Sequence, residues 1–209
     1  AGMPDHVLGN AAVTNDGTVY VIDHVNPIVY RKVPGGRALE AFVSAKELVE
    51  LTDIAVAYDG SRIFVSDAVM GVFVVDPAGQ TSTMLAAPSL VNLGGITAIE
   101  FAYQRLFITQ GGLSPQRILR LELDPSLSQV QNIAPMATAL APYDQPGFGV
   151  IAGGNLIYLA NSGSRDKTAG AIVMASSIEA GEDVAPPDMQ QFQEALMQQQ
   201  QLQQQQQKQ

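Results

Sequence analysis

The stretch TNDGTVYVID at residues 14–23 returns in altered form as AYDGSRIFVSD at residues 57–67. The Asp16-Gly17 pair of the first stretch corresponds to Asp59-Gly60 of the second, 43 residues later. An Asp-Gly pair between two apolar runs predicts a tight hairpin turn, because glycine adopts a positive φ without a steric penalty and aspartate can bond to its own backbone. The stretch therefore indicates a repeated pair of strands.

Two further copies extend the repeat toward the C-terminus. Phe64 in the second copy corresponds to Phe107 in the third, again at a spacing of 43 residues. The fourth copy is NLIYLANSG at residues 155–163, where Tyr158 follows Phe107 by 51 residues because the connection before it is longer. Each copy contains a short apolar strand, a turn, a strand of β-branched and aromatic residues, a polar break and another apolar strand.

A period of about 43 residues that is built from strands predicts an all-β protein, namely a β-propeller of four-stranded antiparallel blades. Leucine-rich and ankyrin repeats have shorter periods, and tetratricopeptide repeats are helical. We expect four blades within a propeller domain of residues 1–177, with approximate bounds of 8–50, 51–94, 95–140 and 141–177.

The first copy also admits a second interpretation. GTVYVIDHV at Gly17–Val25 is similar to the closing strand of fasciclin-type domains. That alternative leaves residues 52–175 unexplained, whereas the propeller interpretation continues through PIVYRKV at Pro27–Val33 as the next strand.

The composition restricts the classes of partner. Eleven basic and 20 acidic side chains give a net charge of −9, which opposes attraction to the phosphates of a nucleic acid. We therefore expect no nucleic-acid partner. The chain has no cysteine, which excludes disulfides, thiolate metal sites and a cysteine nucleophile. No apolar run approaches the roughly 20 residues that cross a bilayer, so no transmembrane segment is expected.

The repeat also predicts where a ligand would bind. In a propeller the first strand of each blade lines the central channel, and the loops that enter these strands surround one mouth. Here the entry positions are Gly9-Asn10, Thr52-Asp53, Thr97 and Gly147. Each copy also ends its second strand on a polar residue that can bond to nearby backbone, namely Asp23, Asp67, Gln110 and Asn161. The candidate ligand-binding residues at the channel mouth are Asn10, Asp53, Thr97, Gln110 and Asn161.

Two longer segments carry a family resemblance. GITAIEFAYQRLFITQGGLSPQRILRLELDP at residues 95–125 and YDQPGFGVIAGGNLIYLANSG at residues 143–163 resemble the C-terminal half of bacterial gluconolactonase-like propellers. This group includes regucalcin and borders on NHL-repeat proteins. The resemblance implies a six-bladed ring, of which about two blades would lie upstream of residue 1. Relatives are often exported, which implies a periplasmic or extracellular location.

The resemblance also implies a chemistry. Lactonases of this family bind one divalent cation in the channel through a glutamate of an early blade and through Asn and Asp side chains. A hard cation such as Ca²⁺ or Mg²⁺ would polarise the lactone carbonyl for attack by water. This chain departs from the pattern at Gly95–Ile99, where Thr97 stands in place of the family's aspartate. Asn10 and Asp53 remain as the candidate metal ligands.

The end of the chain has a different character. An acidic, proline-containing linker at Ile178–Asp188 is followed by Met189, Phe192 and Leu196 at helical spacing, which predicts a short helix over about 189–200. The glutamine-rich tail that ends at residue 209 has almost no apolar surface and is expected to be disordered or a fraying continuation of the helix.

Three functions are compatible with these features. The first is a non-catalytic propeller that binds a small-molecule ligand or a protein at one face, and it is favoured because the channel entries keep few of the family's metal ligands. The second is a divalent-metal-dependent hydrolase that acts on a sugar lactone or similar ester. The third is an interaction protein that uses the C-terminal helix and tail. An open blade edge, or that helix, would also permit self-association.

Overall fold

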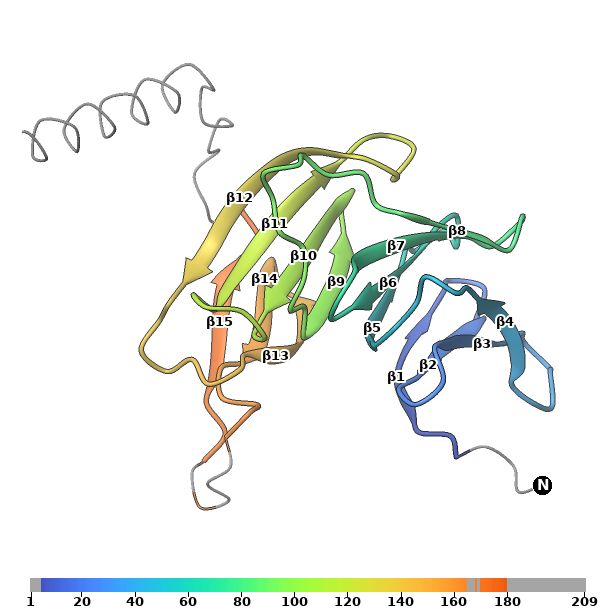
Figure 1. Ribbon diagram of the computed structural model, residues 1–209, viewed down its shortest axis with the longest axis horizontal. Helices are drawn as coiled ribbons and strands as arrows, with labels where there is room; N and C mark the ends of the chain where they lie inside the picture. The colour runs from blue at the N-terminus through green and yellow to red at the C-terminus, as the bar shows by residue number, and fades with distance from the viewer. Residues whose placement is uncertain (1–4, 165–167, 169, 180–209) are drawn as a thin grey trace, which may run out of the picture.

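The computed structural model describes residues 5–164, 168 and 170–179, which form fifteen strands in four antiparallel sheets (Figure 1). The first sheet contains β1 (Leu8–Val13), β2 (Val19–Asp23), β3 (Ile28–Lys32) and β4 (Glu40–Ser44), and the second contains β5 (Leu51–Val56), β6 (Ile63–Asp67), β7 (Gly71–Asp76) and β8 (Thr81–Met84). The third contains β9 (Ala98–Ala102), β10 (Arg105–Gln110), β11 (Arg117–Leu123) and β12 (Val130–Thr138), and the fourth contains β13 (Gly147–Ala152), β14 (Asn155–Leu159) and β15 (Val173–Ser177).

Strands that follow one another in the chain are also neighbours within each sheet. The repeated strands β2, β6, β10 and β14 lie in four different sheets, as a propeller requires, and not side by side in one sheet. The prediction of an all-β protein with antiparallel blades is thus confirmed. The fasciclin interpretation of the first copy is wrong, because Pro27–Val33 provides β3 of the same sheet.

The sheets succeed one another around a common line of first strands. β1 contacts β5, β5 contacts β9, and β9 contacts β13. Figure 1 shows the sheet of β1–β4 at one end of this row and the sheet of β13–β15 at the other. The first strands therefore line the inner, concave side, which is the position that the repeat predicts for a channel wall.

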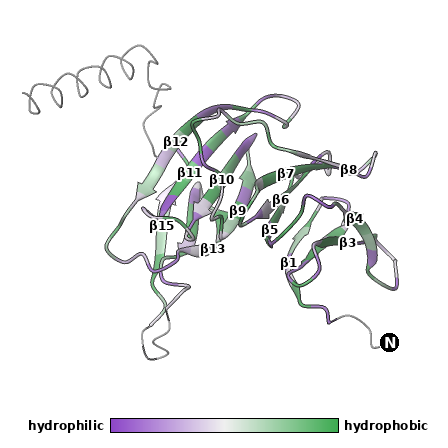
Figure 2. Cartoon of the chain, in the orientation of Figure 1, coloured by the Kyte–Doolittle hydropathy of each residue, from purple (hydrophilic) through white to green (hydrophobic). Residues whose placement is uncertain are grey.

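Apolar side chains fill the spaces between the sheets. Tyr20 and Ile22 of the first sheet pack with Val65 of the second, and Phe64 of the second packs with Ile108 of the third. Phe107 packs in turn with residues of the fourth sheet. Figure 2 shows hydrophobic residues along the strands and hydrophilic residues gathered in the turns. Burial of one such aromatic side chain stabilises the fold by about 2–3 kcal/mol, so the three interfaces supply the main cohesion between sheets.

The fourth repeat is offset by one residue from the sequence prediction. The side chains of β10 that face the preceding sheet are Leu106 and Ile108, and those of β14 that face the preceding sheet are Leu156 and Tyr158. Tyr158 therefore corresponds to Ile108, and Ile157 stands in the place of Phe107. The assignment of Tyr158 to the position of Phe107 is therefore wrong. Both residues are aromatic, but Tyr158 faces the preceding sheet and Phe107 faces the following one.

The Asp-Gly turns form as predicted. Gly17 and Gly60 adopt φ values of 83° and 73°, which glycine reaches without strain. The carboxylates of Asp16 and Asp59 accept hydrogen bonds from the backbone N–H groups two residues on, at 3.0 and 2.9 Å. These aspartates act in the turn itself.

Some predictions fall outside the described residues. The expected helix over 189–200 and the glutamine-rich tail are not among them, and the described part of the chain contains no α-helix. Within that part, no helical segment has the length and hydrophobicity needed to cross a membrane. The six-bladed ring stays a prediction.

Candidate functional site

A pocket of about 460 Å³ lies along the first strands of all four sheets. Its wall is formed by residues from each of these strands: Asn10, Ala11, Ala12, Val13, Asp53, Ile54, Ala55, Val56, Glu100, Phe101, Phe148 and Gly149. Its volume falls in the range of small-molecule sites, but the surface that faces its interior is more polar than apolar.

β-Bulges shape this pocket at the start of three inner strands. The pairing register shifts between Leu8 and Ala11 in β1, between Leu51 and Asp53 in β5, and between Gly147 and Gly149 in β13. A bulge leaves an extra residue unpaired and re-aims its side chain. Phe148 is that residue in β13, where its φ of 41° is unusual for a residue with a side chain. The bulge places the half-exposed Phe148 ring on the pocket wall.

Asp53 joins three sheets through one carboxylate. Its Oδ1 accepts hydrogen bonds from Asn10 Nδ2 of the first sheet at 2.6 Å and from the Ile54 backbone N–H at 2.8 Å. Its Oδ2 accepts from the Ile99 N–H of the third sheet at 2.8 Å. Burial raises the pKa of Asp53 above its ordinary value, although the hydrogen bonds from Ile99 and Asn10 act against this rise. The candidates Asn10 and Asp53 are thus brought together, as partners of each other.

Glu100 is the residue of the pocket that the sequence analysis missed. It pairs with Phe107 across the sheet, in the register position that Ala12 and Ala55 occupy opposite Tyr20 and Phe64. Its partly buried carboxyl group makes no hydrogen bond or ion pair with any described residue. Burial, assisted by the negative charge of Asp53, raises the pKa of Glu100 to about 7. The signal was a single charged residue inside the otherwise apolar strand AIEFA.

Thr97 lies between the third and fourth sheets. Its Oγ1 donates a hydrogen bond to the Pro146 carbonyl oxygen at 2.5 Å and accepts one from the Gly111 N–H at 3.2 Å. Thr97 is not on the wall of the pocket. In the structure its hydroxyl connects the loops that precede β9 and β13.

Gln110 and Asn161 are bound to the backbone of nearby loops. Gln110 is fully buried; its Nε2 donates to the carbonyl oxygens of Asn92 and Gly94 at 2.9 and 2.7 Å, and its Oε1 accepts from Arg117. Asn161 donates to the Gly170 carbonyl and accepts from the Ile172 N–H. Neither residue lines the pocket, so the structure does not bring the five candidates together.

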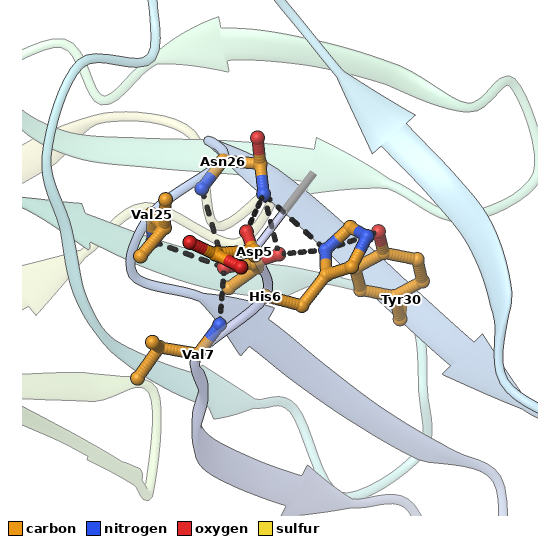
Figure 3. A network of polar contacts seen from close by, with 7 residues as sticks. Asp5, His6, Val7, Val25, Asn26 and Tyr30 are labelled. Carbon is orange, nitrogen blue, oxygen red and sulfur yellow. Dashed lines mark hydrogen bonds and ion pairs between the residues drawn. The ribbon is translucent and has the colours of Figure 1, made fainter. Parts of the chain in front are cut away.

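The aspartates at the ends of β2 and β6 organise loops in the same way. Both side chains are fully buried. Asp23 accepts hydrogen bonds from the N–H groups of Val7, Val25 and Asn26 and pairs with His6 Nδ1 at 2.6 Å (Figure 3). Burial acts to raise the pKa of Asp23, but the hydrogen bonds from His6 and the backbone outweigh it and hold this pKa well below the usual range. The network in Figure 3 therefore holds His6 and Val7, which precede β1, against the first sheet.

The donor set of the pocket does not fit a divalent metal ion. Both oxygens of Asp53 already accept hydrogen bonds from Asn10, Ile54 and Ile99. Asn10 turns its NH₂ group, not its oxygen, toward that carboxylate. Among the residues that the structure describes, no group of three or more His, Cys, Asp or Glu side chains could hold a metal ion. A hard cation would need to displace the bonds that connect three sheets.

Comparisons with known proteins bear on the fold. No protein-family model and no curated protein matches the chain. Among solved structures, it is similar to hydrazine synthase of Kuenenia stuttgartiensis, with a TM-score of 0.62 and 17% identity over 84% of this chain and 47% of that one. It is similar to TolB of Acinetobacter baumannii, with a TM-score of 0.61 and 13% identity over 85% of this chain and 42% of that one.

A third similar structure is that of a nidogen/laminin complex, with a TM-score of 0.50 and 17% identity over 75% of this chain and 73% of that one. The chain thus spans less than half the length of the first two structures. TolB and nidogen are β-propeller proteins. At these identities the likeness shows the fold alone, and the fold of this chain is that of a β-propeller.

Proposed function

We propose that this chain is a non-catalytic propeller module that binds a cationic group in the channel pocket. The observation that carries the proposal is Glu100, a partly buried carboxyl group with no partner among the described residues. A carboxyl group in such a position is costly to the fold, and perturbed, unpaired acids in a pocket are typical of binding sites.

The surroundings of Glu100 favour a cation with an apolar body. Asp53 adds a second acidic group to the wall, and the net charge of −9 attracts positive ligands from a distance. Phe148 supplies aromatic surface, which suits the apolar part of an alkylamine or guanidine and, face-on, its charge. The Phe101 ring instead stacks on Phe64 at a centroid distance of 4.9 Å. Ala12 and Ala55 leave room in the pocket because their side chains are small.

This chemistry belongs to small amines and to the lysine or arginine side chains of a protein. The pocket volume of about 460 Å³ accommodates either. One similar propeller structure is that of a nidogen/laminin complex, which supports a protein partner as the source of the group. The relation to gluconolactonase-like proteins stays a prediction.

Titration with n-butylamine, followed by ¹H–¹⁵N NMR, tests the proposal. We expect the amide signals of Glu100, Phe101 and Phe148 to shift with a Kd in roughly the millimolar range, as suits a ligand of few atoms. Raising the pH from 6 to 8 ionises Glu100, whose pKa is about 7, while the amine keeps its charge. The affinity for butylamine is therefore expected to rise by roughly 5–10-fold over this range.

Two controls make this result specific. n-Butanol has the same carbon chain without the charge, and it is expected to produce no saturable shift. Glu100→Gln is expected to weaken butylamine binding by roughly 10-fold or more, whereas Glu47→Gln, at an exposed position away from the pocket, leaves it unchanged. Equal binding of butanol and butylamine, or full binding by Glu100→Gln, would show that the pocket does not select cations.

A further inference from the structure

Among the residues that the structure describes, none packs as a further sheet on one face of the fourth sheet. Leu156 and Tyr158 pack against Phe107 of the third sheet, so the alternating residues Ile157 and Leu159 point to the opposite side. Across the sheet Ile157 pairs with Val150, and Leu159 pairs with Val173. We call Val150, Ile157, Leu159 and Val173 the leading face.

The leading face has the composition of an interface between sheets. In the third sheet the equivalent positions include Phe107 and Ile118, whose exposures are 1% and 0% because the fourth sheet covers them. Val150 and Val173 are instead 54% and 62% exposed. A contiguous apolar surface of this kind marks an interaction site.

On the opposite face of the first sheet, His6 contacts Tyr30 edge-on, but no other sheet in the described part of the chain packs there. Tyr20 and Ile22 of the first sheet pack against the second sheet, so Val19 and Val21 point away from it. Val13 pairs with Val19, and Tyr30 pairs with Val21. We call Val13, Val19, Val21 and Tyr30 the trailing face.

The trailing face repeats an interface that already exists within the chain. At the equivalent register positions the second sheet has Val56, Ile63, Val65 and Phe73, all of which pack against the first sheet. The substitutions between the two sets are conservative in size and hydrophobicity. The trailing face is thus built to receive the kind of surface that the leading face presents.

We propose that a second copy of this chain covers both faces. The leading face of each copy packs on the trailing face of the other, which generates two identical contacts related by a two-fold axis. Each contact continues the stacking that connects the sheets within one chain. Two sets of four sheets close into a ring of eight, in place of the six-bladed ring that the family resemblance implies, and eight blades lie within the usual range of propellers. The inner strands of the second copy then complete the channel opposite Glu100.

Light scattering coupled to size-exclusion chromatography of the full chain tests this proposal. We expect a mass of about twice the 22.1 kDa of one chain at 50 µM protein. Val150→Asp changes only the leading face, and Val21→Asp changes only the trailing face. Each is expected to weaken the dimer by roughly 100-fold or more, because it places an unpaired charge in both contacts.

The matched control is Tyr58→Asp, at a 73% exposed turn position between β5 and β6, which is expected to remain a dimer. Far-UV circular dichroism of the variants confirms that the monomers are folded. A wild-type monomer at 50 µM would overturn the proposal. A dimer that survives either single-face variant would place the contact elsewhere, including the C-terminal region, and would overturn it as well.

Discussion

Asp67→Ala is expected to lower the free energy of unfolding by about 3–5 kcal/mol. The Asp67 side chain is fully buried at the end of β6. One oxygen accepts hydrogen bonds from the N–H groups of Val69 and Met70, both at 2.9 Å. The other accepts from Val49 and Glu50, at 2.6 and 2.8 Å. Alanine leaves all four donors without their acceptor and opens a cavity between two loops.

Urea unfolding followed by circular dichroism measures this loss. Asp67→Asn keeps one oxygen and two of the hydrogen bonds, so we expect an intermediate value. The matched control is Asp59→Ala in the same sheet, where an exposed aspartate bonds to the Ser61 N–H and the expected loss is below about 1 kcal/mol. A loss for Asp67→Ala no larger than that of Asp59→Ala would contradict the assignment of Asp67 as the organiser of these loops.

Asp53→Ala is expected to cost about 2–4 kcal/mol of stability. Its one carboxylate accepts hydrogen bonds both from Asn10 of the first sheet and from Ile99 of the third. Removing it leaves the Ile99 N–H without its acceptor and leaves the Asn10 amide only its longer hydrogen bond to the Thr52 carbonyl oxygen, at 3.4 Å. Because the bonds cross from sheet to sheet, the loss is also expected to loosen the pocket wall around Glu100.

Urea unfolding measures the stability, and hydrogen exchange of the Ile99 amide reports the local effect. In Asp53→Ala the Ile99 amide is expected to exchange faster than the loss of global unfolding free energy alone would cause. The control is Asp76→Ala, which removes an exposed turn acceptor of the Ala78 N–H and is expected to change neither quantity by much. Protection of Ile99 that equals the wild-type value would show that Asp53 does not connect the sheets.

The repeat made the blades predictable, because strand periodicity and Asp-Gly turns are local signals. In the second copy, the strand expected after the Asp59-Gly60 turn is β6, and the apolar strand expected after the polar break is β7. The outermost strands were harder to place. β8 is the polar segment TSTM, and β12 contains Pro135. Edge strands bury less surface and tolerate proline, so their sequences carry a weaker strand signal.

The site was less predictable, because it depends on which face of a strand a residue occupies. The prediction that a ligand binds where the first strands begin placed Asn10 and Asp53 correctly on the pocket wall. It did not distinguish a side chain that is free for a ligand from one already bound by its own fold, as in Gln110. Glu100 lies three residues beyond its entry position, and only the cross-strand register opposite Phe107 reveals it.

The pKa of Glu100 itself tests whether the channel holds a buried, unpaired acid. Its side-chain carboxyl ¹³C signal can be assigned by comparison with Glu100→Gln and followed by NMR from pH 3 to 9. We expect a midpoint at about 7, and a lower midpoint when n-butylamine is present because the cation favours the ionised form. A midpoint near the ordinary value of 4.5, unchanged by butylamine, would contradict a buried, unpaired acid in the channel.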